Sequence, residues 1–139
     1  MEFKSNKKIR EFTDLLAWQA AYRLALLIQR ELKTFPSEEK FGITSQIRRS
    51  VLSVTANIAE GFGKRTYNEK VHYYYQAHGS LTETKNHLLL AKGYEYVSPE
   101  SFNAVMDDLG DAHKLLIGLI QSTKKLAAHS RIKNLESKF

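Results

Sequence analysis

An all-α protein, built as a single up-and-down four-helix bundle, is predicted from three observations. The two prolines, Pro36 and Pro99, fall between long segments of helical periodicity. No segment has the alternation of apolar and polar residues that is typical of a strand. The chain has 139 residues, of which 42% are hydrophobic, enough for one domain with a buried core. Four helices joined by short connections form such a bundle.

The first helix is expected from about Thr13 to Lys33. Thr13 can cap it, and Asp14 suits the positive end of a helix. Its apolar residues form a main stripe and a flanking stripe that widens the buried face. The main stripe contains Leu15, Trp18, Tyr22, Ala25 and Leu32, and the flanking stripe contains Leu24, Ile28 and Phe35. Pro36 ends this helix.

The second helix is expected over residues 37–62, with Ser37 as its N-cap. Apolar residues recur at steps of three and four, which places them on one face. These residues are Ile43, Ile47, Val51, Val54 and Ile58. The sequence Gly61-Phe62-Gly63 is expected to close the helix, because glycine readily takes the left-handed conformation that ends many helices.

Two longer helices follow. The third is expected to run from the turn at residues 61–66 to about Gly93, and the fourth begins at Ser98-Pro99-Glu100, a cap followed by proline and an acid. The buried face of the third contains Tyr74, Ala77, Leu81, Thr84, Leu88 and Ala91. The fourth has a heptad seam of Phe102, Val105, Leu109, Ala112, Leu116, Leu119, Thr123 and Leu126. Such a seam predicts neighbours packed nearly parallel or antiparallel.

The net charge of +6 is concentrated at the two ends of the sequence. Residues 1–10 carry four basic and one acidic side chain, and residues 123–139 carry five basic and one acidic. We therefore divide the chain into a basic arm (1–12), a bundle (13–123) and a basic tail (124–139). Basic arms bind phosphates without recognising sequence. The alternative is that they are solvated and only maintain solubility, and both interpretations stay open.

Several classes of site are disfavoured by composition. The chain has no cysteine, which excludes disulfides, thiolate chemistry and zinc fingers. It has no uncharged apolar run of membrane-spanning length, and its first residues lack the apolar stretch of a signal peptide. We expect a cytoplasmic protein without membrane contact, metal or cofactor.

A polar stripe lies beside the apolar face of the expected second helix. Its members, together with a glutamate on the third helix, are Gln46, Arg49, Asn57, Glu60 and Glu83. A buried arginine needs carboxylates and amides around it, because an unpaired buried charge is very costly. We therefore predict a structural polar network or a subunit interface, in preference to a ligand site.

Four motifs occur in one order along the chain: FTDLLAWQAA, FP-x-E-x-x-FGI-x-x-QIRRS, S-x-x-x-NIAEGFG and AHGSLTET. Over about residues 12–122, the chain resembles the four-helix bundle proteins encoded by intervening sequences in bacterial 23S rRNA genes. The resemblance implies a small up-and-down bundle that is usually a homopentamer, with no established enzymatic activity. That architecture is similar to the accessory protein of diversity-generating retroelements, which binds nucleic acid beside a reverse transcriptase. His78, before Gly79, departs from the small or basic residue expected there.

We expect a non-catalytic oligomeric module that binds nucleic acid, structured RNA in particular, with low sequence specificity. The candidate phosphate contacts are Lys7, Lys8, Arg10, Arg48, Lys64, Arg65, Lys124 and Lys125. Four tyrosines, at 67 and 73–75, lie near these cations and could stack on bases. Three consecutive tyrosines on a helix point in different directions, so at least one belongs to the core. A protein-interaction scaffold without nucleic-acid binding is the alternative.

Two enzymatic interpretations have weaker support. Glu69-Lys70-Val71-His72 matches one Glu-x-x-His pair of a di-metal bundle, but such sites need two pairs and the chain has no second. Arg65 precedes His72 by seven residues, and a helical ribonuclease would need this histidine as general acid or base. One such spacing is expected by chance among seven arginines and five histidines. No catalytic residue is assigned.

Overall fold

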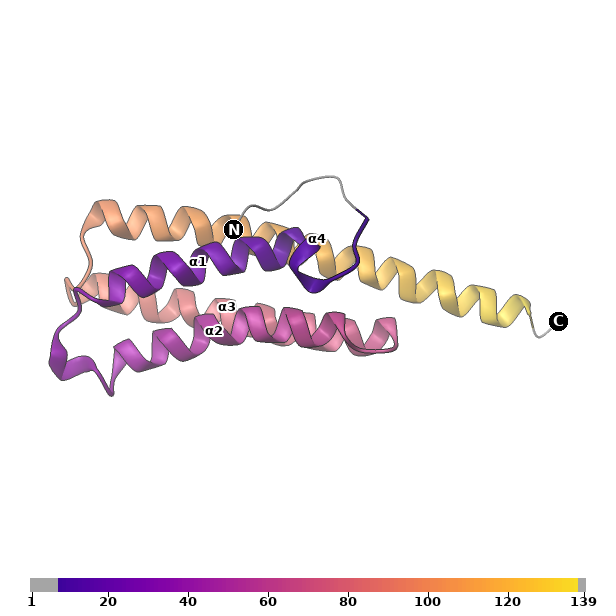
Figure 1. Ribbon diagram of the computed structural model, residues 1–139, viewed down its shortest axis with the longest axis horizontal. Coiled ribbons are helices and arrows are strands. Elements are labelled where there is room, and N and C mark those ends of the chain that lie inside the picture. The colour runs from indigo at the N-terminus through magenta and orange to yellow at the C-terminus, as the bar shows by residue number, and fades with distance from the viewer. Residues whose placement is uncertain (1–7, 138–139) are drawn as a thin grey trace.

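The computed structural model describes residues 8–137, a range that contains four α-helices, two short 3-10 helices and no strand. The elements are η1 (Phe12–Asp14), α1 (Leu16–Leu32), η2 (Ser37–Glu39), α2 (Ile43–Phe62), α3 (Tyr67–Gly93) and α4 (Pro99–Glu136). Each α-helix packs against its neighbours in the sequence, and α1 also packs against α4 (Figure 1). This closed ring of contacts is the predicted up-and-down bundle. Within the described range, no helix combines the length and hydropathy needed to cross a membrane.

The first helix begins later than its cap residues suggest. Phe12–Asp14 form a 3-10 turn, and Leu15 is extended, with φ −72° and ψ 125°. The Asp14 carboxylate accepts from the backbone N–H groups of Arg10 and Glu11, at 2.9 and 3.0 Å, so it closes this turn and does not cap α1. The buried Gln19 side chain donates to the Thr13 carbonyl at 2.9 Å. This turn ties the start of α1 to the chain before it.

The second helix also begins later than predicted. Ser37–Glu39 form a separate 3-10 turn, and α2 starts only at Ile43. Between them Gly42 has φ −107° and ψ −123°, far from helical values, so one continuous helix from Ser37 is not possible. The Gly42 carbonyl accepts the first helical hydrogen bond from the N–H of Gln46, at 3.1 Å.

The buried residues confirm the predicted faces of α2 and α3. On α1, the flanking stripe is buried more completely than the main stripe. In α2, four of the five predicted residues are buried and Ile43 is partly buried; in α3, all six are buried. The flanking stripe is buried, with Leu24 and Ile28 on α1 and Phe35 just after its end. Of the main stripe, Leu15 and Leu32 are buried, whereas Trp18, Tyr22 and Ala25 are only partly buried. Ala17, Ala20 and Ala21 of α1 are also buried, and their small side chains leave room for the flanking stripe in the core.

The seam of α4 is buried only as far as Thr123. Ile120 is buried more deeply than the predicted Leu119, and Leu126 is 48% exposed. The helix nevertheless continues to Glu136, past the end of the bundle (Figure 1). Most of the segment predicted as a tail, residues 124–136, is therefore helical, and it has no buried residue.

Gly61 lies where α2 packs tightly against α3. It is buried inside α2, and a Cβ atom there would lie 2.8 Å from Tyr73 Cβ and 2.9 Å from Tyr74 Cε1. The expected left-handed closure is wrong: Gly63 caps α2 with φ −77°, and no glycine in residues 8–137 has a positive φ. Gly61 is required for space, not for a left-handed backbone.

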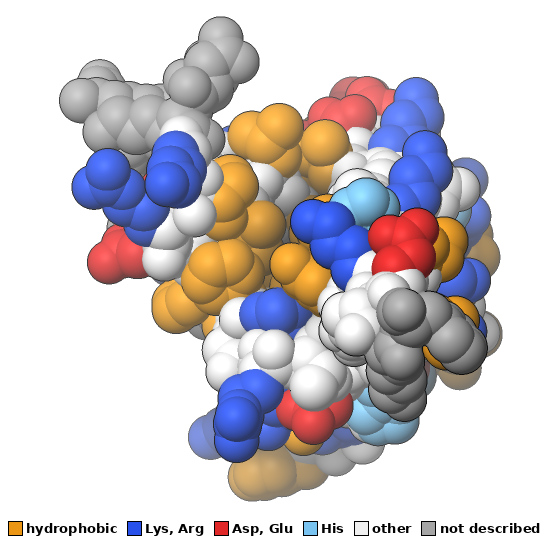
Figure 2. Space-filling view, turned by 90° about the vertical axis from the view of Figure 1, so that its right-hand side faces the viewer, with side chains coloured by type: hydrophobic (Ala, Val, Ile, Leu, Met, Phe, Trp, Pro, Cys, Tyr) orange, Lys and Arg blue, Asp and Glu red, His pale blue; other side chains and the backbone are white. Residues whose placement is uncertain are grey.

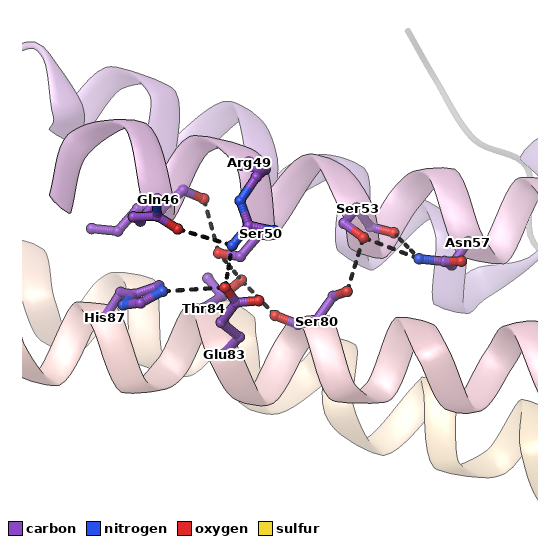
Figure 3. Close-up of polar contacts among 10 residues, drawn as sticks. Gln46, Arg49, Ser50, Ser53, Asn57, Ser80, Glu83, Thr84 and His87 are labelled. Atoms are coloured by element: carbon purple, nitrogen blue, oxygen red, sulfur yellow. Dashed lines mark hydrogen bonds and ion pairs between the residues drawn. The ribbon is translucent and has the colours of Figure 1, made fainter. Parts of the chain in front are cut away.

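Polar side chains join α2 to α3 along a seam (Figure 3). At its exposed edge, Arg49 pairs with Glu83 and is also bonded to Gln46, at 2.9 Å. Glu83 also lies 3.4 Å from His87 Nε2. The Arg49 side chain is 58% exposed, so the pair lies at the surface and is not the buried arginine that the sequence suggested.

The deeper part of the seam is uncharged. Thr84 Oγ1 lies 2.8 Å from Ser50 Oγ, and both residues are fully buried. One step along, Ser53 and Ser80 hydroxyls lie 2.9 Å apart, and Asn57 donates to the Ser53 carbonyl at 2.9 Å. The Glu60 side chain is exposed and makes no hydrogen bond or ion pair within residues 8–137. Hydroxyl pairs thus connect the two helices in the more deeply buried part of the seam.

We expect Gly61→Ala to lower the free energy of unfolding by about 1–3 kcal/mol, because the new methyl group forces α3 away from α2. Gly79→Ala is the matched control: this exposed glycine of α3 has open space where a Cβ would lie, with no atom within 4 Å. The control should raise the free energy of unfolding by up to about 1 kcal/mol, since alanine favours helix. Urea-induced unfolding followed by circular dichroism measures both, and equal effects would contradict the packing argument.

We expect the Arg49–Glu83 pair to contribute less than about 1 kcal/mol in a double-mutant cycle, because both side chains are partly exposed. Burial alone would raise the pKa of Glu83, but its hydrogen bonds and ion pairs with Arg49 and His87 outweigh burial and lower it. The contribution should therefore be complete above the ordinary glutamate pKa of about 4.3 and decrease as the pH falls through the lowered pKa of the folded state. Urea unfolding of the four proteins of the cycle, at pH 7 and pH 4, measures the coupling free energy of the pair. A coupling that is larger at pH 4 than at pH 7 would contradict the prediction.

Candidate nucleic-acid interface

The fold brings the turn between α2 and α3 to the C-terminal part of α4. A shallow groove runs between them, lined by Thr66, Tyr67 and Asn68 on one side and by Ala127, Ser130, Arg131 and Asn134 on the other. The predicted cations Lys64 and Arg65 belong to the turn, and Lys124 and Lys125 belong to α4 just before the groove. Residues about 60 apart in the sequence therefore share one end of the molecule (Figure 1).

The turn is short because both of its ends are closed by local hydrogen bonds. The Lys64 N–H donates to the Gly61 carbonyl at 3.1 Å, and the Thr66 side chain accepts from the Glu69 N–H at 3.1 Å, capping α3. Arg65, between them, is exposed and has no ion pair within the described chain. The turn therefore presents its guanidinium group to solvent.

Three lysines at this end lie over aromatic rings. Lys64 Nζ is 4.8 Å from the ring centre of Tyr73, and Lys124 Nζ is 5.6 Å from that of Tyr75 and 3.2 Å from its hydroxyl. These contacts hold the ammonium groups near the surface of α3. Lys70, over the ring of Phe62, differs: it also donates to the Phe62 carbonyl at the end of α2, and burial lowers its pKa. Lys70 therefore closes α2 and is not a free cation.

The tyrosines point in different directions, as predicted. Tyr74 is 2% exposed and belongs to the core, where burial raises the pKa of its hydroxyl to about 12. Tyr73 is partly buried, whereas Tyr75 and Tyr67 are 48% and 38% exposed. Two rings are thus accessible at this end, and Tyr67 lines the groove.

The N-terminal cations are separate from the groove between the turn and α4. Lys7 falls outside the described residues; Lys8 and Arg10 are exposed and line a hollow with Glu11 and Asp14. Ile9, between the two cations in the sequence, lines a groove between the start of α1 and α4; the α4 lining residues are Lys114, Leu115, Gly118 and Leu119. Figure 2, which faces the end where α4 projects, shows Lys and Arg side chains around an apolar area, with acidic groups among them.

Arg48 is separate from the other predicted cations. It lies in the second turn of α2, and its Nε is 3.3 Å from Gln29 Oε1 on α1. The helix runs a further 14 residues from Arg48 to Phe62, a distance of about 20 Å along the axis. The structure therefore brings Lys64, Arg65, Lys124 and Lys125 to one end, and leaves Arg48 toward the other.

Arg131 lines the groove but is absent from the residues predicted as phosphate contacts. The prediction placed it in a tail beginning at residue 124, whereas α4 continues through this segment to Glu136. The sequence contains a signal for this: no proline or glycine interrupts residues 119–136.

The residues of the two enzymatic interpretations do not form a larger cluster. His72 is exposed, and its Nε2 lies 3.1 Å from the Gln76 side-chain nitrogen. Across residues 8–137, no three His, Asp or Glu side chains gather in a way that could hold a metal ion.

Comparison with known proteins agrees with the four sequence motifs. The model of the 23S rRNA-intervening sequence protein family matches residues 13–118. A crystal structure of a protein of unknown function from the S23 ribosomal protein family of Bacteroides thetaiotaomicron is similar, with 27% identity and a TM-score of 0.70. The match covers 76% of this chain and 98% of that one. No curated protein matches the chain.

The family match spans all of α1, α2 and α3 and more than half of α4, and the similar crystal structure has the same fold over nearly its whole length. The chain belongs to the 23S rRNA-intervening sequence protein family.

Proposed function

We propose that this protein is a non-catalytic module that binds nucleic acid, structured RNA in particular, through phosphate contacts of low sequence specificity. The observation that supports this most strongly is the gathering of Lys64, Arg65, Lys124, Lys125 and Arg131 at one end of the bundle. Cations from a turn and a helix offer phosphates several contacts from one surface.

The accessible aromatic rings suit the same ligand. Tyr67 and Tyr75 are partly exposed beside these cations, and unpaired bases stack on such rings without sequence preference. Lys64 and Lys124, held over tyrosine rings, keep N–H donors that face solvent. A loop or an end of an RNA offers both the phosphates and the unstacked bases that this surface would bind.

Self-association is the second part of the proposal. The part of α4 beyond Thr123 carries apolar side chains that its own bundle does not cover: Leu126, Ile132 and Leu135 are 48%, 54% and 52% exposed. Contact between copies would bury them, in keeping with the homopentamer that the family resemblance implies. Several copies would bring several basic ends together, and multivalency strengthens weak contacts.

The test compares binding of a labelled structured RNA, and of a DNA duplex of equal length, across a series of salt concentrations. We expect affinity to fall steeply with salt, because phosphate contacts release counterions. The double variant Lys64→Gln/Arg65→Gln should bind more weakly, and its slope of log affinity against log salt should be shallower by about 0.7–0.9 for each cation–phosphate pair removed. Fluorescence anisotropy gives both quantities.

Arg48→Gln is the control for loss of positive charge elsewhere, since it removes one such charge about 20 Å from the turn. It should leave the salt slope unchanged. Absence of binding at low salt would overturn the proposal and favour a protein-interaction scaffold. Cleavage of the RNA that disappears in His72→Ala would instead favour a weak ribonuclease.

A further inference from the structure

Two histidines from different helices meet at the surface between α3 and α4, away from the basic end. His78 lies on α3 and His113 on α4, 35 residues apart, and their Nε2 atoms are 3.2 Å from each other. The ring centres are 5.2 Å apart, with an angle of 42° between the ring planes. The two Nε2 atoms therefore lie side by side.

This separation is the one that two ligands of a single metal ion have. With metal–nitrogen bonds of about 2.0–2.1 Å, two imidazole nitrogens at this separation define an angle at the metal of about 100°, close to tetrahedral. A hydrogen bond between two neutral rings has a similar length, but it uses one Nε2–H and one lone pair. The distance alone does not distinguish a shared metal ion from a hydrogen bond between the rings, so the residues around the pair must be considered.

The surroundings leave room for an ion with solvent ligands. The pair faces an open hollow whose other lining residues are Leu81, Thr82, Lys85, Leu109 and Gly110. A Cβ at Gly110 would have no atom within 4 Å, so there is space beside the rings. His113 and Lys85 are exposed, and the lysine ammonium can extend into water on its flexible stem.

The pair is also held in place by the fold. On α3, Leu81 lies three residues after His78 and is 1% exposed. On α4, Ala112 lies directly before His113 and is 2% exposed. These buried neighbours fix both helices at this level. In addition, the Thr82 hydroxyl donates to the His78 carbonyl at 3.1 Å. Two ligands on rigid, packed helices lose little freedom when they bind an ion.

We propose that His78 and His113 form a two-histidine site for a divalent transition-metal ion, with water completing the coordination. Imidazole nitrogen favours Cu²⁺, Ni²⁺ and Zn²⁺, whereas Mg²⁺ and Ca²⁺ prefer oxygen. No third His, Asp or Glu of the described chain joins the pair, so the ion is exchangeable. Because one ligand comes from each helix, the bound ion links α3 to α4 and stabilises the bundle.

The test uses the full chain without a polyhistidine tag, with Ni²⁺ and Zn²⁺ as probes and Mg²⁺ as the negative control. An ion present at about ten times its Kd raises the Tm of a domain of this size by about 5 °C. We expect such a rise with Ni²⁺ and Zn²⁺ and none with Mg²⁺. Isothermal titration should give one ion per chain.

Three variants separate metal binding from other roles of the pair. His78→Ala and His113→Gln should each reduce Ni²⁺ affinity at least about tenfold, and the glutamine can keep a hydrogen bond to His78 although it is a poor metal ligand. His129→Ala, which alters an exposed histidine on the projecting part of α4, should bind as the unaltered chain does. Equal affinity in all variants, or no binding by the unaltered chain, would overturn the proposal and leave a hydrogen-bonded pair.

Discussion

The close approach of α2 and α3 is the constraint on which the rest of the structure depends. It requires a residue without a side chain at Gly61, where Tyr73 and Tyr74 of α3 occupy the space of a Cβ. The same contact buries Tyr74 and leaves Tyr73 under Lys64, whereas Tyr75 meets Lys124 through the packing of α3 on α4. The packing of α2 on α3 thereby determines which tyrosine is buried and which rings remain near the cations of the basic end.

The polar seam has two parts with different physical character. Hydroxyl pairs such as Ser50–Thr84 are small enough to be buried between closely packed helices and satisfy each other there. The Arg49–Glu83 pair needs more room and lies where water still reaches it. Charge at the edge and hydroxyls at the centre allow α2 and α3 to approach without leaving a buried charge unpaired.

Sequence periodicity was sufficient for the fold class and for the buried faces of α2 and α3, because a strict spacing of three and four residues leaves one possible inward face. It was insufficient at the helix starts. Thr13, Asp14 and Ser37 are good cap residues, but here they belong to 3-10 turns, and the backbone at Leu15 and Gly42 decides where the helices begin. Cap residues are shared by both kinds of turn, so composition could not separate them.

Most cations of the candidate site could be predicted from the sequence, but their arrangement in space could not. The cations Lys64, Arg65, Lys124 and Lys125 followed from charge and turn position, while the inclusion of Arg131 depended on how far α4 continues. The His78–His113 pair lies beyond any local pattern, since the two residues meet only through the packing of α3 on α4.

The projection of α4 beyond Thr123 has a consequence for how this sequence can vary. Thr123 is the last buried residue of α4, and the helical residues 124–136 include none that is buried. Substitutions at the exposed positions of this segment therefore remove no core contact. The surface of the projecting helix can be altered while the core of the bundle stays as it is.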